Sequence, residues 1–320
     1  MKAVFYGRNG GPEVLEYGDV PDPAAGAGQV LVRVSAVSIE GGDLIHRRTV
    51  PPTSARHVGG YQAAGVVEAV GAGVTVVRPG QRVVGQADRG SHAELFVVPQ
   101  ERIFPVPDGL DLDLAAPVPV LFGTASDALF EFGRLRAGET VLVQGAAGGV
   151  GVACVQLAKR AGARVIGTAR GADRLERLTA LGMDAGIDHS AEDIGRRARE
   201  LTGGAGVDLV VDMAGGAAVP QLLDALGHRG RYVVVGAAGG GPQSFSFADL
   251  LSKQLTVSGV YLALEIHTAR VHDLVRGFLE DVASGDLTVP VDSVFPLRDA
   301  ARAHAHVEEG HPFGRVLLHP

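Results

Sequence analysis

The sequence predicts an α/β protein with two domains, one rich in short strands and one built on a doubly wound parallel sheet. Residues 1–110 hold short β-branched or alternating segments divided by turn formers. From Val141 onward, apolar strands alternate with segments of helical periodicity. The first of these strands runs through a glycine-rich turn into a helix. The 320 residues are enough for two domains.

The first region predicts closely spaced strands, an arrangement that favours a small β barrel or a pair of packed sheets. One helical turn is expected within it, at Asp43–Arg48. The predicted strands are Ala3–Tyr6, Val14–Tyr17, Gln29–Val37, Gly65–Val70, Arg82–Gly85, His92–Val98 and Ile103–Pro105.

The second region begins with a predicted helix over Leu112–Phe132, which Pro117 and Pro119 interrupt. The alternation that follows predicts strands at Val141–Val143, Arg164–Thr168, Ala185–Asp188, Val207–Asp212 and Arg231–Gly236, with helices between them ending at Ala161, Leu181, Leu201 and Leu226. The remaining elements are expected to be a strand at Leu255–Tyr261, a helix at Glu265–Ser284, a strand at Pro290–Phe295, a helix at Leu297–Glu308 and a strand at Arg315–Leu318.

The glycine-rich turn is the clearest functional signal. Its spacing is Gly145-x-x-Gly148-x-x-Gly151, at the end of a strand and the start of a helix. Backbone N–H groups at a helix N-terminus have no partner within the helix and attract phosphate. The turn therefore predicts a dinucleotide site, with binding residues Gly145, Ala146, Gly148, Gly149, Val150 and Gly151.

Composition excludes several other functions. The net charge is −7 and no basic block is present, so nucleic acid is not an expected partner. The single cysteine, Cys154, falls within a predicted helix and is expected to be a small buried hydrophobe. The first residues lack the long apolar core of a signal peptide, and no apolar run approaches the length of a membrane span. We expect a cytoplasmic enzyme.

Several segments in order carry a family resemblance. Val66–Gly71, Arg78–Val83 and Gly138–Val143 running into the glycine turn resemble the medium-chain dehydrogenase/reductase superfamily. The similarity is greatest to its zinc-free quinone oxidoreductase, or ζ-crystallin-like, branch. The resemblance implies a GroES-like catalytic domain (residues 1–117 and 263–320), a Rossmann domain (118–262), a substrate site between the two, and a homodimer.

The resemblance also implies that zinc is absent. Zinc-dependent relatives carry an early cysteine and a Gly-His-Glu in the segment that here spans Gly59–Gly65, and this chain has neither. His46, His57 and His92 could in principle form a site, but surface or hydrogen-bonded histidines are the expectation. We predict no metal.

The tip of the second Rossmann strand predicts NADPH over NADH. No acid stands there to bind a ribose 2′-hydroxyl, and Arg170 and Arg174 follow. Guanidinium groups grip a 2′-phosphate in bidentate fashion. Asp173 comes after the tip and is interpreted as a helix cap. His189 stands where relatives often have a tyrosine near the adenosine phosphate, and it is either a phosphate donor or a loop residue.

Further cofactor residues are assigned by position. Thr124 matches a family threonine near the nicotinamide. The segments 212–216 and 236–240 follow strands at the carboxyl edge of the sheet, which predicts contacts at Ala214, Gly215, Gly236 and Ala237. Arg315 matches the family's terminal Gly-Lys position, and a structural salt bridge is the expected role.

The catalytic residues are less clearly predicted. Relatives show an Asn and an Asp-x-Tyr where this chain has Glu40 and Asp43-Leu44-Ile45, and Ser126 replaces another tyrosine. Tyr61 and His46 are the remaining candidate proton donors. Glu40 is either a site acid or an ion-pair partner of Arg47, and solvent could also supply the proton.

We therefore predict an NADPH-dependent oxidoreductase that transfers hydride to a quinone or to the C=C bond of an α,β-unsaturated carbonyl. Two alternatives stay open at this point. One is a trans-acting enoyl reductase of a biosynthetic pathway, and the other is a protein that binds NADPH without turnover.

Overall fold

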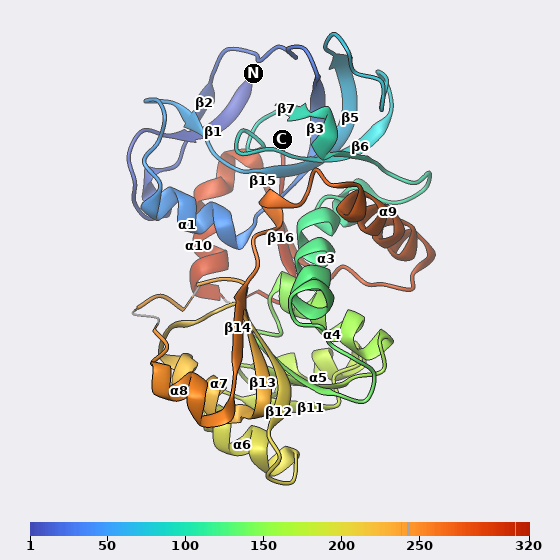
Figure 1. Ribbon diagram of the computed structural model, residues 1–320. Coiled ribbons are helices and arrows are strands. Elements are labelled where there is room, and N and C mark those ends of the chain that lie inside the picture. The colour runs from blue at the N-terminus through green and yellow to red at the C-terminus, as the bar shows by residue number, and fades with distance from the viewer. Residues whose placement is uncertain (238, 242–243, 311) are drawn as a thin grey trace. The chain divides into compact units, whose positions relative to one another are not determined.

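The computed structural model describes residues 1–320 except 238, 242, 243 and 311 (Figure 1). The chain forms two compact units. Unit 1 combines Met1–Val120 with Ala263–Pro320, and unit 2 is Leu121–Leu262. Both ends of the chain therefore belong to unit 1, and unit 2 is inserted as one continuous segment.

Unit 1 contains two sheets. A seven-stranded sheet has the order β15-β16-β3-β5-β6-β8, with β7 also paired to β3, and a three-stranded sheet has the order β2-β1-β4. The only parallel pair described in them is β15 with β16. The strands are β1 (Lys2–Tyr6), β2 (Glu16–Asp19), β3 (Gln29–Ser38), β4 (His57–Val58), β5 (Gln62–Val70), β6 (Arg82–Gln86), β7 (Leu95–Pro99), β8 (Ile103–Pro105), β15 (Val291–Pro296) and β16 (Arg315–His319).

Alternating apolar residues build the core of unit 1. Inward-facing residues such as Val32, Val67 and Phe96 form one cluster with Ala303 and Leu318 from the far end of the chain. The helices of this unit are α1 (Gly41–Thr49), α2 (Leu112–Ala115), α9 (Ala269–Ser284) and α10 (Ala300–Gly310), with 3₁₀ turns at Pro12–Val14, Gln100–Arg102 and Leu297–Asp299.

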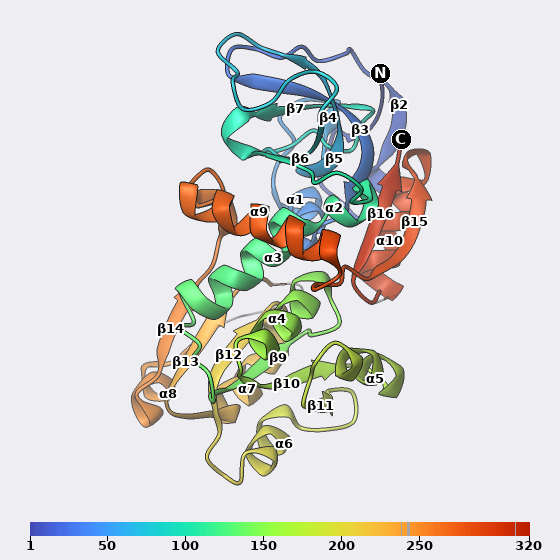
Figure 2. The ribbon, with the colours of Figure 1, turned by 90° about the vertical axis from the view of Figure 1, so that its right-hand side faces the viewer.

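Unit 2 is built on a six-stranded sheet with the order β11-β10-β9-β12-β13-β14 (Figure 2). Every pair in it is parallel. The order reverses beside β9, which places a topological switch point at the strand that leads into the glycine turn. The strands are β9 (Thr140–Gln144), β10 (Arg164–Ala169), β11 (Ala185–Asp188), β12 (Val207–Asp212), β13 (Leu226–Val234) and β14 (Thr256–Gly259).

Helices cover both faces of this sheet. One face packs on α6 (Ile194–Leu201) and α7 (Val219–Ala225), through Leu142, Ile166, Ile187, Val210, Ala198 and Leu222 among others. The other face carries α4 (Gly149–Arg160) and α5 (Ala172–Ala180). The remaining elements are α3 (Val118–Ser126) continuing as a π-helix over Asp127–Glu131, 3₁₀ turns at Gly216–Ala218 and Leu262–Leu264, and α8 (Phe247–Lys253).

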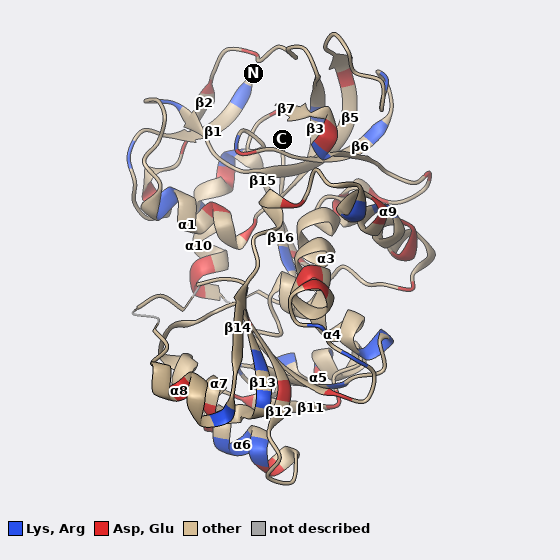
Figure 3. Ribbon diagram, in the orientation of Figure 1, with Lys and Arg blue, Asp and Glu red and all other residues tan. Residues whose placement is uncertain are grey.

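The basic residues that gather on α6 (Figure 3) form ion pairs. Arg196 lies 2.8 Å from Glu200, and Arg197 lies 3.1 Å from the same carboxylate. Arg199 pairs with Asp224 on α7. This cluster therefore tightens the packing of two neighbouring helices and is not an unbalanced basic patch.

The sequence predictions differ from the structure where short elements depend on tertiary contacts. Of the predicted strand Val14–Tyr17, the first residue ends a 3₁₀ turn that Pro12 favours, and Glu16 and Tyr17 begin β2. The predicted helix at 112–132 is broken between Ala115 and Val118, as its prolines indicated. The helix expected to end at Leu226 gives way to β13 at that residue, and α8 was not predicted because its seven residues carry no periodic signal.

Candidate functional site

The glycine turn is held in shape by the neighbouring strand. The backbone N–H of Gly145 donates to Thr168 Oγ1 at 3.1 Å, and the N–H of Ala146 donates to the carbonyl of Thr168 at 3.0 Å. Gly145 has φ +72°, a conformation that favours glycine. The turn closes when the N–H of Gly148 donates to the carbonyl of Gly145 at 3.1 Å.

Gly151 is required by close approach. A Cβ atom at this position would lie 2.4 Å from the carbonyl oxygen of Gly145 and 2.6 Å from Cα of Ala146. Both contacts are to backbone, which cannot rotate away. At Gly148 the nearest atom would be 3.4 Å from an added Cβ, an ordinary distance. The third glycine of the pattern therefore lets α4 pack directly on the turn.

The first turn of α4 fits a pyrophosphate. Gly148 stands at the N-cap in an extended conformation and brings no side chain that could take the first amides of the helix. The N–H groups of Gly149 and Val150 therefore lie at the N-terminus of a 12-residue helix, where the helix dipole favours an anion. The predicted phosphate residues Gly145–Gly151 form one such cradle.

The predicted 2′-phosphate residues lie at the next strand. Arg170 is exposed directly after β10, and Arg174 donates from Nη1 to the carbonyl of Arg170 at 3.3 Å. Asp173 is the second residue of α5 and Gly171 is its N-cap, so the predicted capping role of Asp173 is wrong. In that position its charge favours the helix through the dipole.

An acid whose role the sequence did not predict anchors the loop before α5. Asp188, at the end of β11, accepts from the N–H of Gly171 at 3.1 Å and from the N–H of Ser190 at 3.0 Å. A further hydrogen bond from the Ser190 hydroxyl does most to lower the pKa of Asp188. His189 is exposed beside it. The loop that carries Arg170 is therefore anchored to the next strand tip by a carboxylate.

The loop after β12 is anchored by a buried carboxylate. Asp212 accepts through Oδ1 from the N–H of Ala214 at 2.9 Å and from the N–H of Gly215 at 2.8 Å. Both predicted cofactor residues thus turn their amide donors inward. Their N–H groups are therefore not available to a ligand, and the carbon atoms of the two residues are left for contact, which suits a flat ring lying against backbone.

The loop after β13 packs on the loop after β12. A Cβ atom at Gly236 would lie 2.7 Å from the carbonyl oxygen of Met213, and the N–H of Gly239 donates to the carbonyl of Ala214 at 2.7 Å. Ala237 follows Gly236, whereas Ala238 of the predicted segment lies outside the described residues. An added Cβ at Gly145 would be 3.9 Å from Cβ of Met213, so the phosphate cradle and these loops adjoin at one edge of the sheet.

Thr124 and Ser126 lie on α3, and both are largely buried, at 8% and 5% exposure. Cys154, on α4, is fully buried, and burial raises the pKa of its thiol. The prediction that this cysteine is a packed hydrophobe is confirmed.

In unit 1, Glu40 is a buried ion-pair partner. Its carboxylate lies 2.5 Å from Nη2 of Arg315, accepts from Ser38 Oγ at 2.6 Å and accepts from Gln62 Nε2 at 3.2 Å. Burial raises the pKa of the Glu40 carboxyl, and the charge of Arg315 opposes that rise. The salt bridge expected of Arg315 is confirmed, and the prediction that Glu40 pairs with Arg47 is wrong.

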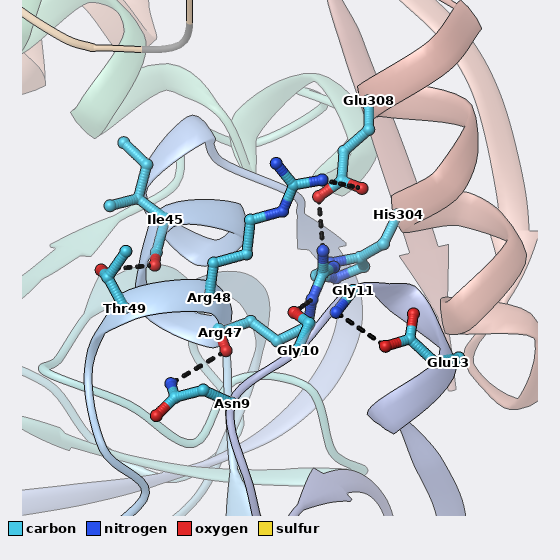
Figure 4. Close-up of polar contacts among 10 residues, drawn as sticks. All are labelled: Asn9, Gly10, Gly11, Glu13, Ile45, Arg47, Arg48, Thr49, His304 and Glu308. Carbon is cyan, nitrogen blue, oxygen red and sulfur yellow. Dashed lines mark hydrogen bonds and ion pairs between the residues drawn. The ribbon is translucent and has the colours of Figure 1, made fainter. Parts of the chain in front are cut away.

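Arg47 instead joins α1 to α10 (Figure 4). Its Nη1 donates to Nδ1 of His304 at 2.7 Å, its Nη2 pairs with Glu308, and its Nε donates to the carbonyl of Gly10 at 3.2 Å. Arg48 lies 2.9 Å from the other oxygen of Glu308. All three guanidinium nitrogens of Arg47 are therefore engaged in structural contacts.

Tyr61 and His46 line one small pocket within unit 1, with Asp43, His92 and Arg47 among its other walls. The ring centroids of His46 and Tyr61 are 6.1 Å apart. Burial, reinforced by the carboxylates of Glu40 and Asp43, raises the pKa of the Tyr61 hydroxyl well above its usual value. Tyr61 therefore keeps its proton at neutral pH and can act as a hydrogen-bond donor.

The histidines of this pocket do not form a zinc site. His57 Nδ1 lies 3.1 Å from Thr53 Oγ1, and buried His92 has Nε2 3.9 Å from Asp43. Across the described part of the chain, no group of three or more His, Cys, Asp or Glu side chains is placed to hold a metal ion. The residues present therefore do not fit a tetrahedral zinc centre.

The described helices are also all too short or too polar to cross a membrane.

A phosphate cradle on a parallel sheet, in a chain whose other unit is β-rich, defines a two-domain dehydrogenase. Residues 26–108 match the alcohol dehydrogenase GroES-like domain family, and residues 149–277 match the zinc-binding dehydrogenase family. The second description includes a metal for which the described residues offer no ligand set.

Individual relatives narrow the class. Quinone oxidoreductase of Pseudomonas aeruginosa is 33% identical, with 100% of this chain and 99% of that protein covered. The 2-haloacrylate reductase of a Burkholderia species is 32% identical with the same coverage. The structure of Escherichia coli quinone oxidoreductase in complex with NADPH is 29% identical, with a TM-score of 0.94 over 100% of both chains. The chain belongs to the zinc-free quinone oxidoreductase branch of the medium-chain dehydrogenase/reductase superfamily.

Proposed function

We propose that this protein is an NADPH-dependent oxidoreductase that reduces a quinone or the C=C bond of an α,β-unsaturated carbonyl without a metal. The observation that carries the proposal is the phosphate cradle at Gly145–Gly151, next to a strand tip that offers Arg170 and Arg174 and no acid at its end. The names of the relatives, quinone oxidoreductase and 2-haloacrylate reductase, support both classes of acceptor.

NADPH would supply the hydride, and the chain's own groups would bind and orient. The amides of Gly149 and Val150 would bind the pyrophosphate, and Arg170 and Arg174 would hold the 2′-phosphate, with His189 at the edge of that site. Ala214, Gly215, Gly236 and Ala237 would form the backbone surface for the nicotinamide, and Thr124 would contact it. Hydride transfer then depends on the positioning of the nicotinamide and the acceptor and on the exclusion of water, and it needs no protein nucleophile.

The reduced acceptor also needs a proton or a hydrogen bond on its developing anion. Tyr61 is the first candidate, because its hydroxyl stays protonated and neighbours a half-buried histidine, His46. Glu40 is the weaker candidate, because three groups already engage its carboxylate. We assign Glu40 a structural role and leave solvent as the alternative donor.

Stopped-flow oxidation of NADPH tests the reaction. The panel contains a benzoquinone, a naphthoquinone, a cyclic enone, a 2-haloacrylate and an enoyl thioester. We expect oxidation with at least one quinone or enone. Oxidation by the enoyl thioester alone would favour a carrier-dependent enoyl reductase. Tight NADPH binding with no oxidation by any acceptor would refute the enzymatic proposal.

The coenzyme preference has its own test. In Arg170→Ala/Arg174→Ala the dissociation constant for NADPH should rise at least about tenfold, since charge-assisted hydrogen bonds to phosphate contribute roughly 1.5–3 kcal/mol. The constant for NADH should hardly change. Arg177→Ala, exposed on the same helix, is the matched control. Equal binding of NADH and NADPH by the wild type would show that the arginines do not select the coenzyme.

We also propose that the protein is a homodimer and works in the cytoplasm. The edge strand β14 and the neighbouring helix α8 support the first part, because Phe247 and Leu251 on α8 are 87% and 77% exposed. Light scattering of the wild type and of Leu251→Glu tests it. A wild-type monomer at micromolar concentration would refute the dimer, and fractionation of the source cells tests the location.

A further inference from the structure

Three donors converge on the carboxylate of Asp212, which is only 1% exposed. Oδ1 accepts the amides of Ala214 and Gly215, and Oδ2 accepts from the hydroxyl of Tyr232 at 2.5 Å. Tyr232 is fully buried, and its ring packs edge-on against Phe245 with centroids 5.2 Å apart. One carboxylate therefore ties the loop after β12 to a fixed side chain of the adjacent strand.

The loop after β12 has an unusual backbone conformation, which the hydrogen bonds to Asp212 stabilise. Gly215 has φ +64° and ψ −140°, a combination that is in practice confined to glycine. Gly216 also has positive φ, and a Cβ added to it would lie 2.6 Å from the carbonyl oxygen of Gly240. The carboxylate of Asp212 takes the two amides that would otherwise turn toward solvent or a ligand. It is therefore a side chain that fixes which way these two peptide planes face.

We propose that Asp212 is the positioning residue for the nicotinamide half of the coenzyme. It acts by holding the peptides of Ala214 and Gly215 with their donors inward, so that the coenzyme ring meets the carbon atoms of the loop instead of N–H donors. Tyr232 supports it by holding the second carboxylate oxygen. This inference rests on the proposed function, because it assumes that NADPH lies across the adjoining phosphate cradle.

The chemistry of the side chain provides a conservative variant. In Asp212→Asn the amide oxygen can still accept both backbone N–H groups, and the amide nitrogen can donate to the hydroxyl of Tyr232, which can accept. Both backbone amides keep their acceptor while the charge is lost, and the Tyr232 hydroxyl changes from donor to acceptor. In Asp212→Ala none of them is satisfied, and in Tyr232→Phe only the contact to Oδ2 is lost.

The experiment measures single-turnover hydride transfer from NADPH to the best acceptor, together with equilibrium binding of NADPH and of 2′,5′-ADP. The fragment 2′,5′-ADP carries the phosphates at the adenosine end and lacks the nicotinamide. We expect Asp212→Ala to slow hydride transfer at least about tenfold, because small errors in the position of reacting groups cost one to two orders of magnitude. Tyr232→Phe should show a smaller loss, and Asp212→Asn should stay within about threefold of the wild type.

Binding of 2′,5′-ADP should be unchanged in all three variants. If Asp212→Ala and Tyr232→Phe transfer hydride at the wild-type rate, or if Asp212→Asn is as slow as Asp212→Ala, the positioning role is refuted. Loss of 2′,5′-ADP binding along with hydride transfer would show general damage and would also overturn it. If Asp212→Ala fails to fold, the hydride-transfer rates of Asp212→Asn and Tyr232→Phe still test the positioning role. A wild type that binds neither ligand would refute the proposed function itself.

Discussion

Replacing Gly151 with alanine should damage the phosphate cradle through a single methyl group. The added Cβ would stand 2.4 Å from the carbonyl oxygen of Gly145 and 2.7 Å from that of Ala146. Ordinary contacts begin near 3.4 Å, so the helix must move away from the turn by up to about 1 Å. Both obstructing atoms belong to the turn that hydrogen-bonds to Thr168.

The cost follows from overpacking of a well-packed contact, which typically amounts to about 1–3 kcal/mol. The free energy of unfolding should fall by about that amount. The displaced amides would no longer converge on the pyrophosphate, so the dissociation constant for NADPH should also rise. If binding loses the same free energy, the rise is about 5- to 150-fold, since 1.4 kcal/mol corresponds to a factor of ten.

Urea unfolding and NADPH fluorescence titration measure the two effects. Gly148→Ala is the matched control for the fold, because its Cβ would be 3.4 Å from the nearest atom and its φ of −75° is one that any residue adopts. We expect this control to cost under about 1 kcal/mol of stability, as alanine is a poor N-cap. A Gly151→Ala protein as stable and as tightly binding as the wild type would refute the reasoning.

Two further predictions concern unit 1. Glu40→Leu should lower the free energy of unfolding in urea by about 3–5 kcal/mol, because it leaves the buried guanidinium of Arg315 without its carboxylate. The double variant Glu40→Leu/Arg315→Met should recover much of that loss, and additive losses would contradict coupling between the two residues. Burial lowers the pKa of His92 to about 4 from an ordinary 6.5, so the unfolded chain binds the proton first as the pH falls. Stability from this residue is complete above pH 6.5 and is lost toward pH 4, by up to about 3 kcal/mol. The wild type should therefore lose more stability over this interval than His92→Phe, and parallel pH profiles would contradict the role of His92.

Much of the fold could be predicted because its signals are local. The apolar strands of unit 2 read as continuous runs, and each is followed by a helical period, so the parallel sheet follows from the pattern. The cradle was also predictable, since the glycines at 145, 148 and 151 stand between a strand and a helix. Short elements such as β4 and α8 were not, because two or seven residues hold their shape through neighbours distant in sequence.

The polar partners of the site could not be predicted for the same reason. Glu40 and Arg47 are seven residues apart and look like a natural pair, yet each binds a residue more than 250 positions away. Asp212 and Asp188 looked like the polar ends of strands, and only the structure places the amides of the following loops against their carboxylates. Residue type and spacing identify a loop that binds phosphate, whereas the choice of ion-pair partner depends on which strands become neighbours.

The insertion of unit 2 into unit 1 sets an order of events during synthesis. All six strands of the parallel sheet lie between Thr140 and Gly259, so they are available as soon as that stretch has left the ribosome. Strand β16, which pairs with β3 and carries Arg315, is made last. Until then, Glu40 lacks the cation that it pairs with in the folded protein, and β3 lacks one of its neighbouring strands. The sheet of unit 2, which carries the phosphate cradle, can therefore form while unit 1, which holds Tyr61, still lacks β16.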